Sequence, residues 1–400
     1  MAHREDWQFL LAGEGPRRWL ALGDRPALGL RQRAVRHRLQ VRLTAVDCQQ
    51  QARDALRQWQ TWRDAGLAVA GYLGYDLGAA LEGVAPQVHA SQWPDADLCA
   101  FAPGDLEPTV LPAVTPQPAL PLPESLLRQS AWFQHAVEQA LDAIRAGEVY
   151  QVNLSVAAEL AFATQRPLPE MLAALLAVQP VPYALVWQAE QGTLLSGSME
   201  QFLRVQGALV QSRPIKGTAP RQADPMADVH AAAQLAQTVK ERAENTMIVD
   251  MVRNDLQRAS HWQSVQVAAL CEPTPYATLW HLESEVHSVL RNPDDRAGLL
   301  EATLPPASVT GCPKIQATRV IGRLEQRWRG PYCGALGLDL PDGALDLAVG
   351  IRQVWLQPGH AVLQVGAGIV AQSEPEREWQ ELCVKAQGAL RLLATLRGGQ

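Results

Sequence analysis

Seven prolines fall between positions 103 and 123, in the run PGDLEPTVLPAVTPQPALPLP. Proline lacks a backbone N–H and holds φ at about −65°, so this run can form neither a helix nor a central strand. We therefore expect an extended surface connection at 103–123. It joins an N-terminal part at 1–102 to a larger region at 124–400. The N-terminal part can still pack onto the same core, so the connection need not separate independent domains.

On either side of this connection, the chain alternates between the spacing of strands and that of helices. The run GLAVAGYLGYDLG at 66–78 favours short strands, and VYQVNLSVAAEL at 149–160 predicts a longer strand. The run at 130–147 has helical spacing and ends at a glycine, which is typical of a helix C-terminus. Long helices are also predicted at 228–256 and 375–397. These elements predict an α/β or α+β fold with extensive sheets.

Composition excludes several classes of protein. A net charge of −6 argues against a nucleic-acid-binding protein, which usually carries a basic patch. The longest uncharged run, 171–187, contains two prolines, so it favours a helix, a turn and a strand over a membrane span. Residues 1–10 show no apolar core of a signal peptide. Six scattered cysteines without a CxxC pair fit neither a zinc site nor a disulfide framework, so we expect a cytoplasmic protein.

Two of the predicted helices each carry a pair of glutamates three residues apart. Glu241 and Glu244 share one helix face, as do Glu378 and Glu381, and Lys385 follows one turn later. Either pair alone is more often a solvated surface. Two such faces turned toward one cleft would form an oxygen-rich site. Mg²⁺ would suit it, because this ion uses one or two carboxylates together with waters and substrate oxygens.

The run PPASVTGCPK at 305–314 offers a second candidate site. Thr310 can cap a helix there, and the free N–H groups of the helix start, beside Gly311, would attract an anion. An ordinary capped helix explains the same residues. His281, in TLWHLESEV, has a similarly plain explanation as a core histidine.

Two further features of the C-terminal third favour anion binding. Arg352 stands in an otherwise apolar strand, where an inward-facing guanidinium needs a carboxylate partner. The small residues at 366–368 would let a ligand touch the backbone. Their GxG run lacks the spacing of a dinucleotide site.

Lys216 stands between Ile215 and Gly217 in the run PIKGT. A lysine on a surface strand usually serves solubility. A lysine in an apolar cleft instead loses its proton readily and becomes a nucleophile. The residues by themselves leave both explanations open.

Six segments occur in a characteristic order: YQVNLS, PIKGT, ERAENTMIVDMVRNDL, SVTGCPK, YCGALG and VGAGIVAQSEPEREWQE. Together they resemble the chorismate-utilising enzymes, a family that includes anthranilate, isochorismate, salicylate and aminodeoxychorismate synthases. The match covers residues 130–397, and GYLGYDLG extends it into the N-terminal part. The resemblance implies one α/β unit, in which two large antiparallel sheets pack as a sandwich with helices around them.

The resemblance also implies a set of site residues. Glu244 and Glu381 match the family's Mg²⁺ ligands, with Glu241 and Glu378 as outer carboxylates. The positions that hold chorismate's two carboxylates in this family are Tyr332, Arg352, Gly366, Ala367, Gly368 and Lys385 here. Further substrate contacts fall on Gly217, His281, Thr310 and Gly311.

Two positions separate the chemistries within the family. Gln151 stands where the water-adding members carry a lysine base, and a neutral amide cannot deprotonate water. Lys216 matches the aminodeoxychorismate synthases, whereas anthranilate synthases have alanine there. The resemblance implies that the Lys216 amine attacks C2 of chorismate and that ammonia then adds at C4. Glu200 matches the general acid/base of the family.

The function implied is that of aminodeoxychorismate synthase component I, which makes 4-amino-4-deoxychorismate for p-aminobenzoate and folate synthesis. No glutaminase signature surrounds any of the cysteines, so a separate glutamine amidotransferase subunit is expected to supply ammonia. The alternatives are anthranilate synthase component I and a non-catalytic chorismate-binding protein. Pro182, Tyr183 and Ala184 resemble one wall of the tryptophan pocket of some relatives. The segment at 20–30 does not match the other wall.

Overall fold

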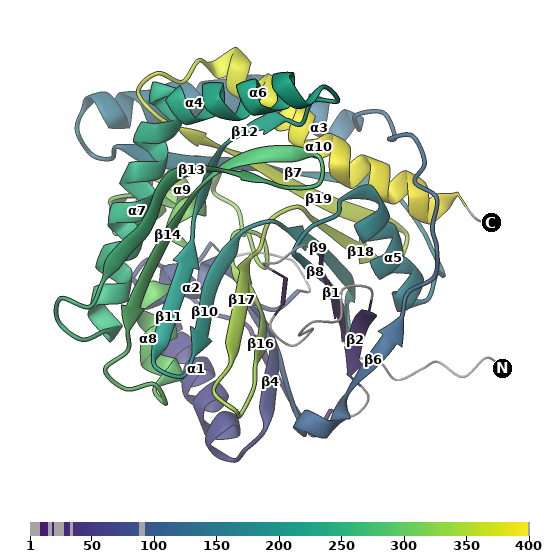
Figure 1. Ribbon diagram of the computed structural model, residues 1–400, viewed down its shortest axis with the longest axis vertical. Helices are drawn as coiled ribbons and strands as arrows, with labels where there is room; N and C mark the ends of the chain where they lie inside the picture. The colour runs from purple at the N-terminus through teal and green to yellow at the C-terminus, as the bar shows by residue number, and fades with distance from the viewer. Residues whose placement is uncertain (1–8, 15–17, 20–27, 33–34, 88–92, 399–400) are drawn as a thin grey trace.

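The computed structural model describes residues 9–14, 18–19, 28–32, 35–87 and 93–398. These residues form two large sheets in which every neighbouring pair of strands is antiparallel (Figure 1). The sheets pack as a sandwich surrounded by helices, which confirms the predicted fold. Residues 1–8, where the sequence shows no signal-peptide core, lie outside the described part.

The first sheet runs, in spatial order, through β15 (Gly311–Cys312), β7 (Gln151–Ala161), β19 (His360–Ile369), β18 (Gln353–Gln357), β9 (Gly192–Ser198), β8 (Tyr183–Ala189), β1 (Phe9–Ala12), β2 (Leu28–Gln32) and β6 (Leu106–Val110). The second runs through β12 (Ile215–Pro220), β14 (Leu279–Val289), β11 (Leu209–Arg213), β10 (Gln201–Gln206), β17 (Leu345–Val349), β16 (Ala335–Asp339), β4 (Ala68–Leu73), β5 (Ala96–Phe101) and β3 (His37–Val41), and β13 (Gln266–Pro275) also pairs with β14. Strands from the first 102 residues therefore belong to both sheets.

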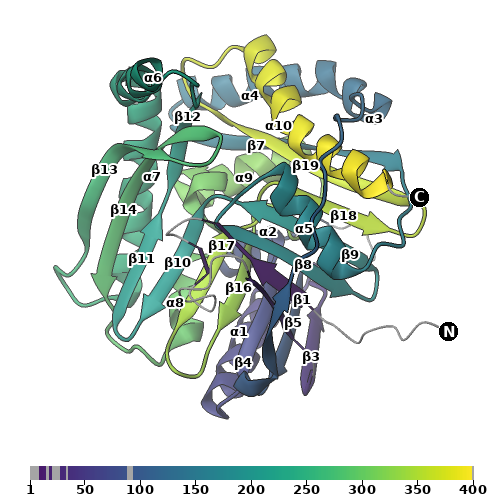
Figure 2. The ribbon, with the colours of Figure 1, turned by 45° about the vertical axis from the view of Figure 1, so that its right-hand side comes forward.

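Helices cover the outside of both sheets. Those beside the first sheet are α3 (Glu124–Leu127), α4 (Ser130–Arg145), α5 (Leu168–Val178), α9 (Lys314–Glu325) and α10 (Pro375–Arg397). Those beside the second are α1 (Cys48–Asp64), α6 (Pro225–Gln237), α7 (Val239–Ala259) and α8 (Arg296–Thr303), and α2 (Tyr75–Leu81) packs on α1. Figure 2 shows α4 and α10 over β7 and β19, and α7 beside β14. None of the described helices is long and apolar enough to cross a membrane.

Several predicted elements are confirmed. Helix α4 ends just before Gly147, whose φ of 76° is the left-handed conformation that glycine adopts easily. The run at 171–187 divides into α5 and β8, and α10 matches the helix predicted at 375–397. The single helix predicted at 228–256 is wrong, because Thr238 has extended backbone angles and separates α6 from α7.

The proline-rich run also differs from its prediction. Its residues Leu106–Val110 form β6, which pairs with β2 at the edge of the first sheet. An edge strand tolerates Pro108 because one side of the strand has no partner to bond. Only residues 111–123 are irregular, and they run along α10, where the Gln117 N–H donates to Thr395 Oγ1 at 3.0 Å.

Aromatic side chains fill the space between the two sheets. Phe9 stacks on Trp187, its neighbour in the first sheet, with ring centroids 5.6 Å apart. It also contacts Phe101 of the second sheet at 5.6 Å. All three are fully buried. Such rings bury much apolar surface and add a preference for tilted or offset pairing, so they fix the distance between the sheets.

Two of the connections between the sheets lie at neighbouring points. The chain leaves β9 for β10 through Met199 and Glu200, and it returns from β17 to β18 through residues 350–352. The Val349 N–H donates to the Glu200 carbonyl at 3.1 Å, and the Gly197 N–H donates to the Arg352 carbonyl at 3.2 Å. Arg352 was expected inside a strand; it lies in the second crossing instead, with φ of 52°. The two crossings are therefore tied together by backbone hydrogen bonds.

The segment at 305–314 does not form the predicted helix cap. Helix α9 begins at Lys314 with Pro313 as its N-cap, and the Thr310 hydroxyl donates to the Pro306 carbonyl at 2.8 Å. Lys314 is buried and donates to Asp255 of α7 at 2.6 Å and to the Thr303 carbonyl at 2.7 Å. This ion pair joins α9 to α7 beneath the segment that contains Thr310.

Replacing Asp255 should destabilise the protein strongly. Asp255→Ala leaves the buried Lys314 ammonium without its carboxylate, and the loss of one partner of a buried pair costs about 3–5 kcal/mol. Asp250→Ala is the matched control on the same helix, because Asp250 is exposed and pairs only with Arg253. Its effect should stay within about 0.5 kcal/mol. Urea unfolding measures both values, and equal losses would contradict the importance of the buried pair.

Candidate active site

A cleft of about 660 Å³ opens beside the two crossings. Strands β12 and β14 and helix α7 form one side, and β19 and α10 form the other. Most of the predicted site residues line it: Glu200, Lys216, Gly217, Glu241, Glu244, His281, Tyr332, Arg352, Gly366, Gly368, Glu378, Glu381 and Lys385. Segments far apart in the sequence therefore meet in one place.

Three predicted residues do not line the cleft. Ala367 is fully buried on the opposite face of β19 from Gly366 and Gly368. Thr310 is also fully buried, and Gly311 pairs with β7. A Cβ on Gly311 would stand 2.2 Å from the Gln151 carbonyl oxygen, so this glycine allows the close approach of β15 to β7. Both residues thus shape the wall behind the cleft.

Lys216 lies on β12, next to an irregularity in the strand. The register with β14 shifts between Lys216 and Thr218, where Gly217 has φ of 74°. A bulge of this kind redirects the side chains beside it. The Lys216 amine is half-buried in the cleft and donates to the Ser308 carbonyl at 2.9 Å. The explanation as a freely solvated surface lysine does not fit these contacts.

Glu200 lies in the first crossing and is 5% exposed. Burial raises the pKa of its carboxyl to about 7, although the Ser308 hydroxyl and Lys216 act in the opposite direction. A carboxyl with this pKa is partly protonated at neutral pH, so it can give a proton and take one back. Ser308 therefore contacts both Glu200 and Lys216.

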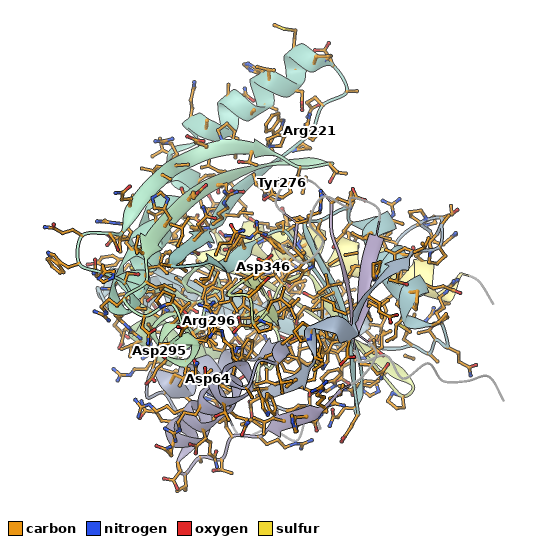
Figure 3. The ribbon with its side chains drawn as sticks, turned by 60° about the horizontal axis from the view of Figure 1, so that its bottom comes forward. Asp64, Arg221, Tyr276, Asp295, Arg296 and Asp346 are labelled. Carbon is orange, nitrogen blue, oxygen red and sulfur yellow. The ribbon has the colours of Figure 1, made fainter. Side chains whose placement is uncertain are left out.

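The end of β12 is anchored to its neighbours. Arg221 forms an ion pair with Asp228 of α6 at 2.7 Å, lies over the Trp280 ring at 4.7 Å and donates to the Tyr276 carbonyl at 3.0 Å. Figure 3 shows Arg221 and Tyr276 below α6. These contacts hold the strand that carries Lys216.

Gln151 of β7 is fully buried, and neither polar atom of its side chain has a partner among the described residues. A Cβ on Gly368 would stand 3.0 Å from Gln151 Nε2 and 3.5 Å from Lys216 Nζ. The amide and the amine thus face the same point of the cleft wall, and a side chain at position 368 would crowd both.

Four glutamates from two helices face the cleft together. Glu241 and Glu244 come from α7, and Glu378 and Glu381 from α10. Burial raises the pKa of Glu244 to about 7, whereas Lys385, at 2.7 Å, lowers the pKa of Glu381. Lys240, outside this set, lies 3.9 Å from Glu244 and 3.3 Å from Glu378, so it joins the two helices.

The glutamates offer oxygen ligands to a metal ion. Within the described ranges, no three His, Cys, Asp or Glu side chains are placed to hold a metal by themselves. Carboxylates from two helices, open to the cleft, suit Mg²⁺, which completes its shell with water and substrate oxygens.

Positive charge lies beside Gly366, next to the glutamates. Lys385 Nζ donates to the Gly366 carbonyl at 3.1 Å, and Arg352 Nη1 donates to the Lys385 carbonyl at 3.3 Å. A Cβ on Gly366 would stand 3.0 Å from the Tyr332 hydroxyl. In the part of the chain that the structure describes, Arg352 has no carboxylate partner. An anionic group can therefore bind between these side chains.

His281 is buried at the edge of the cleft. Its Nδ1 lies 3.0 Å from the Thr218 hydroxyl and 3.4 Å from the Gly217 carbonyl, and its Nε2 has no partner among the described residues. Burial lowers the pKa of this imidazole to about 4, so the ring is neutral at pH 7. With the proton on Nδ1, Nε2 can accept a hydrogen bond from a hydroxyl in the cleft.

The family model described as chorismate binding enzyme matches residues 8–391. The chain belongs to this family. It is 38% identical over 267 residues to anthranilate synthase component 1 of Thermus thermophilus, covering 67% of this chain and 57% of that protein. It is 40% identical over 269 residues to aminodeoxychorismate synthase of Streptomyces pristinaespiralis, covering 67% and 37%. It is 35% identical over 255 residues to aminodeoxychorismate synthase component 1 of Escherichia coli, covering 64% and 56%.

A solved structure supports the same fold. Anthranilate synthase component I of Streptococcus pneumoniae is 24% identical, with a TM-score of 0.76 over 94% of this chain and 95% of that one. The matched part spans about half the length of two of the three curated relatives and a smaller share of the third. Family membership thus fixes chorismate chemistry but does not choose among its products.

Sequence reasoning missed several cleft residues of this family member. Asn153, Lys240, Ser308 and Gln364 all line the cleft. Strand spacing could have predicted Gln364, because it lies two residues before Gly366 and therefore on the same face of a strand. Lys240 lies one helical turn before Glu244. Ser308 could not be predicted from helical or strand spacing, because it lies in the irregular segment before α9.

The residues expected to form a tryptophan pocket pack within the chain. Pro182, Tyr183 and Ala184 are buried at the start of β8. The Trp19 ring lies edge-on to Tyr183 at 4.9 Å, and its Nε1 donates to the Ala184 carbonyl at 3.1 Å. Residues 20–27 of the opposite wall lie outside the described part. Tryptophan binding at this wall stays a prediction.

Glu200→Gln should change how stability depends on pH. Glu200 is protonated in both states below its ordinary pKa of 4.5, but between pH 4.5 and 7 only the unfolded chain ionises, so wild-type stability falls. Glutamine does not ionise. The free energy of unfolding of the variant relative to wild type should therefore rise by about 3 kcal/mol across this range.

Urea unfolding at half-unit pH steps measures this difference. Glu190→Gln, an exposed turn position, is the control and should show a nearly constant difference. Parallel curves for wild type and Glu200→Gln would show that burial does not hold a proton on Glu200.

Proposed function

We propose that this chain acts as aminodeoxychorismate synthase component I, with Lys216 as a covalent nucleophile. The observation that carries the proposal is the position of the Lys216 amine, in the cleft, 2.9 Å from the Ser308 carbonyl and beside the buried Glu200. Two of the three relatives above are named aminodeoxychorismate synthase, one of them as component 1, and the third is an anthranilate synthase component 1. The two activities differ in which carbon receives nitrogen.

The cleft suits a dianion such as chorismate. Arg352, Lys385 and Tyr332 would bind the carboxylate of the enolpyruvyl side chain beside Gly366. Glu244 and Glu381 would hold Mg²⁺, with Glu241 and Glu378 beyond them. When bound, the ion supplies positive charge opposite the ring carboxylate.

In the first step, the neutral Lys216 amine forms a bond to C2 of the ring. The two ring double bonds shift, and the bond between C4 and its hydroxyl oxygen breaks. Glu200 gives its proton to the departing oxygen, which leaves as water. The resulting carboxylate can then take the extra proton from the new C2–N bond. The product of this step is a lysine adduct that has lost one water.

In the second step, ammonia forms a bond to C4. The double bonds shift back and the C2–N bond breaks. Glu200 gives its proton to the leaving Lys216 nitrogen, which recovers its amine, and takes a proton back from the new ammonium on C4. The enolpyruvyl group stays attached throughout, so no pyruvate is formed. Gln151 favours this course over hydration, because its neutral amide cannot remove a proton from water. We further propose that a separate glutamine amidotransferase subunit supplies the ammonia.

The product identifies the reaction. Purified chain with chorismate, ammonium salt and Mg²⁺ should form 4-amino-4-deoxychorismate, because the lysine blocks C2 and directs nitrogen to C4. Liquid chromatography with mass spectrometry detects this compound, and a coupled dehydrogenase assay detects pyruvate. Stoichiometric pyruvate with anthranilate fluorescence would identify an anthranilate synthase instead. No product at all would favour a non-catalytic chorismate-binding protein.

The lysine adduct provides a direct test of the mechanism. Incubation with chorismate and Mg²⁺ without ammonia should add the mass of chorismate less one water to the peptide that contains Lys216. Lys216→Ala should show no adduct and lose at least about a hundredfold in rate, as for other removed nucleophiles. Lys216→Arg keeps the charge but not the nucleophile, and should lose as much. Wild-type rates in either variant would disprove covalent catalysis.

A further inference from the structure

Gln364 is a cleft residue without an assigned role. It lies on β19, two residues before Gly366 and four before Gly368, so all three share one face of the strand. All three line the cleft. Gln364 is 4% exposed, so its amide lies deep within the cleft wall.

The amide of Gln364 has no settled partner. Its Oε1 is buried and makes no hydrogen bond with the described residues. The described residues form no hydrogen bond that fixes the orientation of this amide. Its N–H₂ group can therefore turn toward a ligand in the cleft. Buried polar groups without partners are uncommon in folded proteins, and each requires an explanation.

The order of contacts along β19 indicates which ligand group Gln364 meets. Position 368 faces the Lys216 amine, and position 366 faces the Tyr332 hydroxyl and Lys385. Gln364 follows next in the same direction, and four residues of strand span about 13 Å. If the ring lies at Lys216 and the carboxylate of its side chain lies at position 366, Gln364 is the next residue beyond that carboxylate on the same face of the strand.

Electrostatics at this end favour an anion. Ser155 of β7 pairs with Gly366, and its hydroxyl accepts a hydrogen bond from Arg327 Nη2. The Nε and Nη1 atoms of Arg327 are buried and have no partner among the described residues, whereas its Nη2 lies 3.4 Å from Glu325, so this cation is partly compensated behind the wall. Arg352 and Lys385 add two further cations near Gly366.

We propose that the Gln364 amide donates a hydrogen bond to the carboxylate of the enolpyruvyl group and selects substrates that carry this side chain. The inference rests on the proposed chorismate reaction. Gln364 thereby determines specificity at the part of the cleft wall beside Gly366, without taking part in bond making.

Calorimetric binding to Lys216→Ala separates binding from turnover. The probes are chorismate and 4-hydroxybenzoate, each with Mg²⁺; the second has the ring carboxylate but no side chain. Adding Gln364→Leu should weaken chorismate binding about tenfold, as for a lost hydrogen bond to a charged group, and leave 4-hydroxybenzoate binding unchanged. Gln364→Glu should weaken chorismate binding further, because it places a like charge beside the carboxylate.

Gln357→Leu is the matched control, since Gln357 lies at the end of β18, away from the cleft. It should change neither affinity. If Gln364→Leu leaves the chorismate affinity unchanged, or lowers the affinity for both probes equally, the proposed role of Gln364 is wrong. Neither result would contradict the proposed function of the chain. If Lys216→Ala binds 4-hydroxybenzoate but not chorismate, the proposed function is wrong, and so is the inference about Gln364 that rests on it.

Discussion

The site depends on the two adjacent crossings between the sheets. A strand that leaves one sheet for another must expose backbone groups at the corner, and buried backbone groups need partners. Here the two crossings form hydrogen bonds with each other, from the Val349 N–H to the Glu200 carbonyl and from the Gly197 N–H to the Arg352 carbonyl. The same pairing places an acidic and a basic side chain at one cleft, on rigid strand ends. The left-handed backbone of Arg352 costs energy that this mutual bonding offsets.

Charge balance explains how so many ionisable groups share one cleft. Glu241, Glu244, Glu378 and Glu381 share the cleft with the side chains of Lys216, Lys240 and Lys385. Burial favours the neutral carboxyl at Glu244, while the short contact with Lys385 keeps Glu381 ionised. The two helices thus lie close together before a divalent ion arrives. An ion bound there would compete with lysine for the same oxygens, and any lysine released could turn to a substrate carboxylate.

The sequence predicts the elements and the clustering better than it predicts local geometry. Period-two and helical spacing placed Glu244, Glu381 and Gly368 on the correct elements, and the ordered motifs placed them at one cleft. Spacing could not show that Thr238 breaks a helix or that Arg352 lies in a crossing. The backbone angles at such points depend on contacts with residues far away in the sequence. Pro108 was misjudged for a related reason: whether proline fits a strand depends on the strand being at an edge. Ser308 could be placed at the cleft only from the folded structure, because it lies in an irregular segment.

Reaction choice in this cleft comes down to which nitrogen-bearing side chain stands beside Gly368. Gln151 and Lys216 approach the same point from different sheets, the amide from β7 and the amine from β12. A basic group at position 151 could activate water there, whereas an amine at position 216 can itself bond to carbon. The bulge at Gly217 directs the amine into the cleft, and the packing of β15 on β7 holds the amide behind the wall. For the proposed reaction, an amide at position 151 and an amine that faces the cleft would together favour attack by lysine over attack by water.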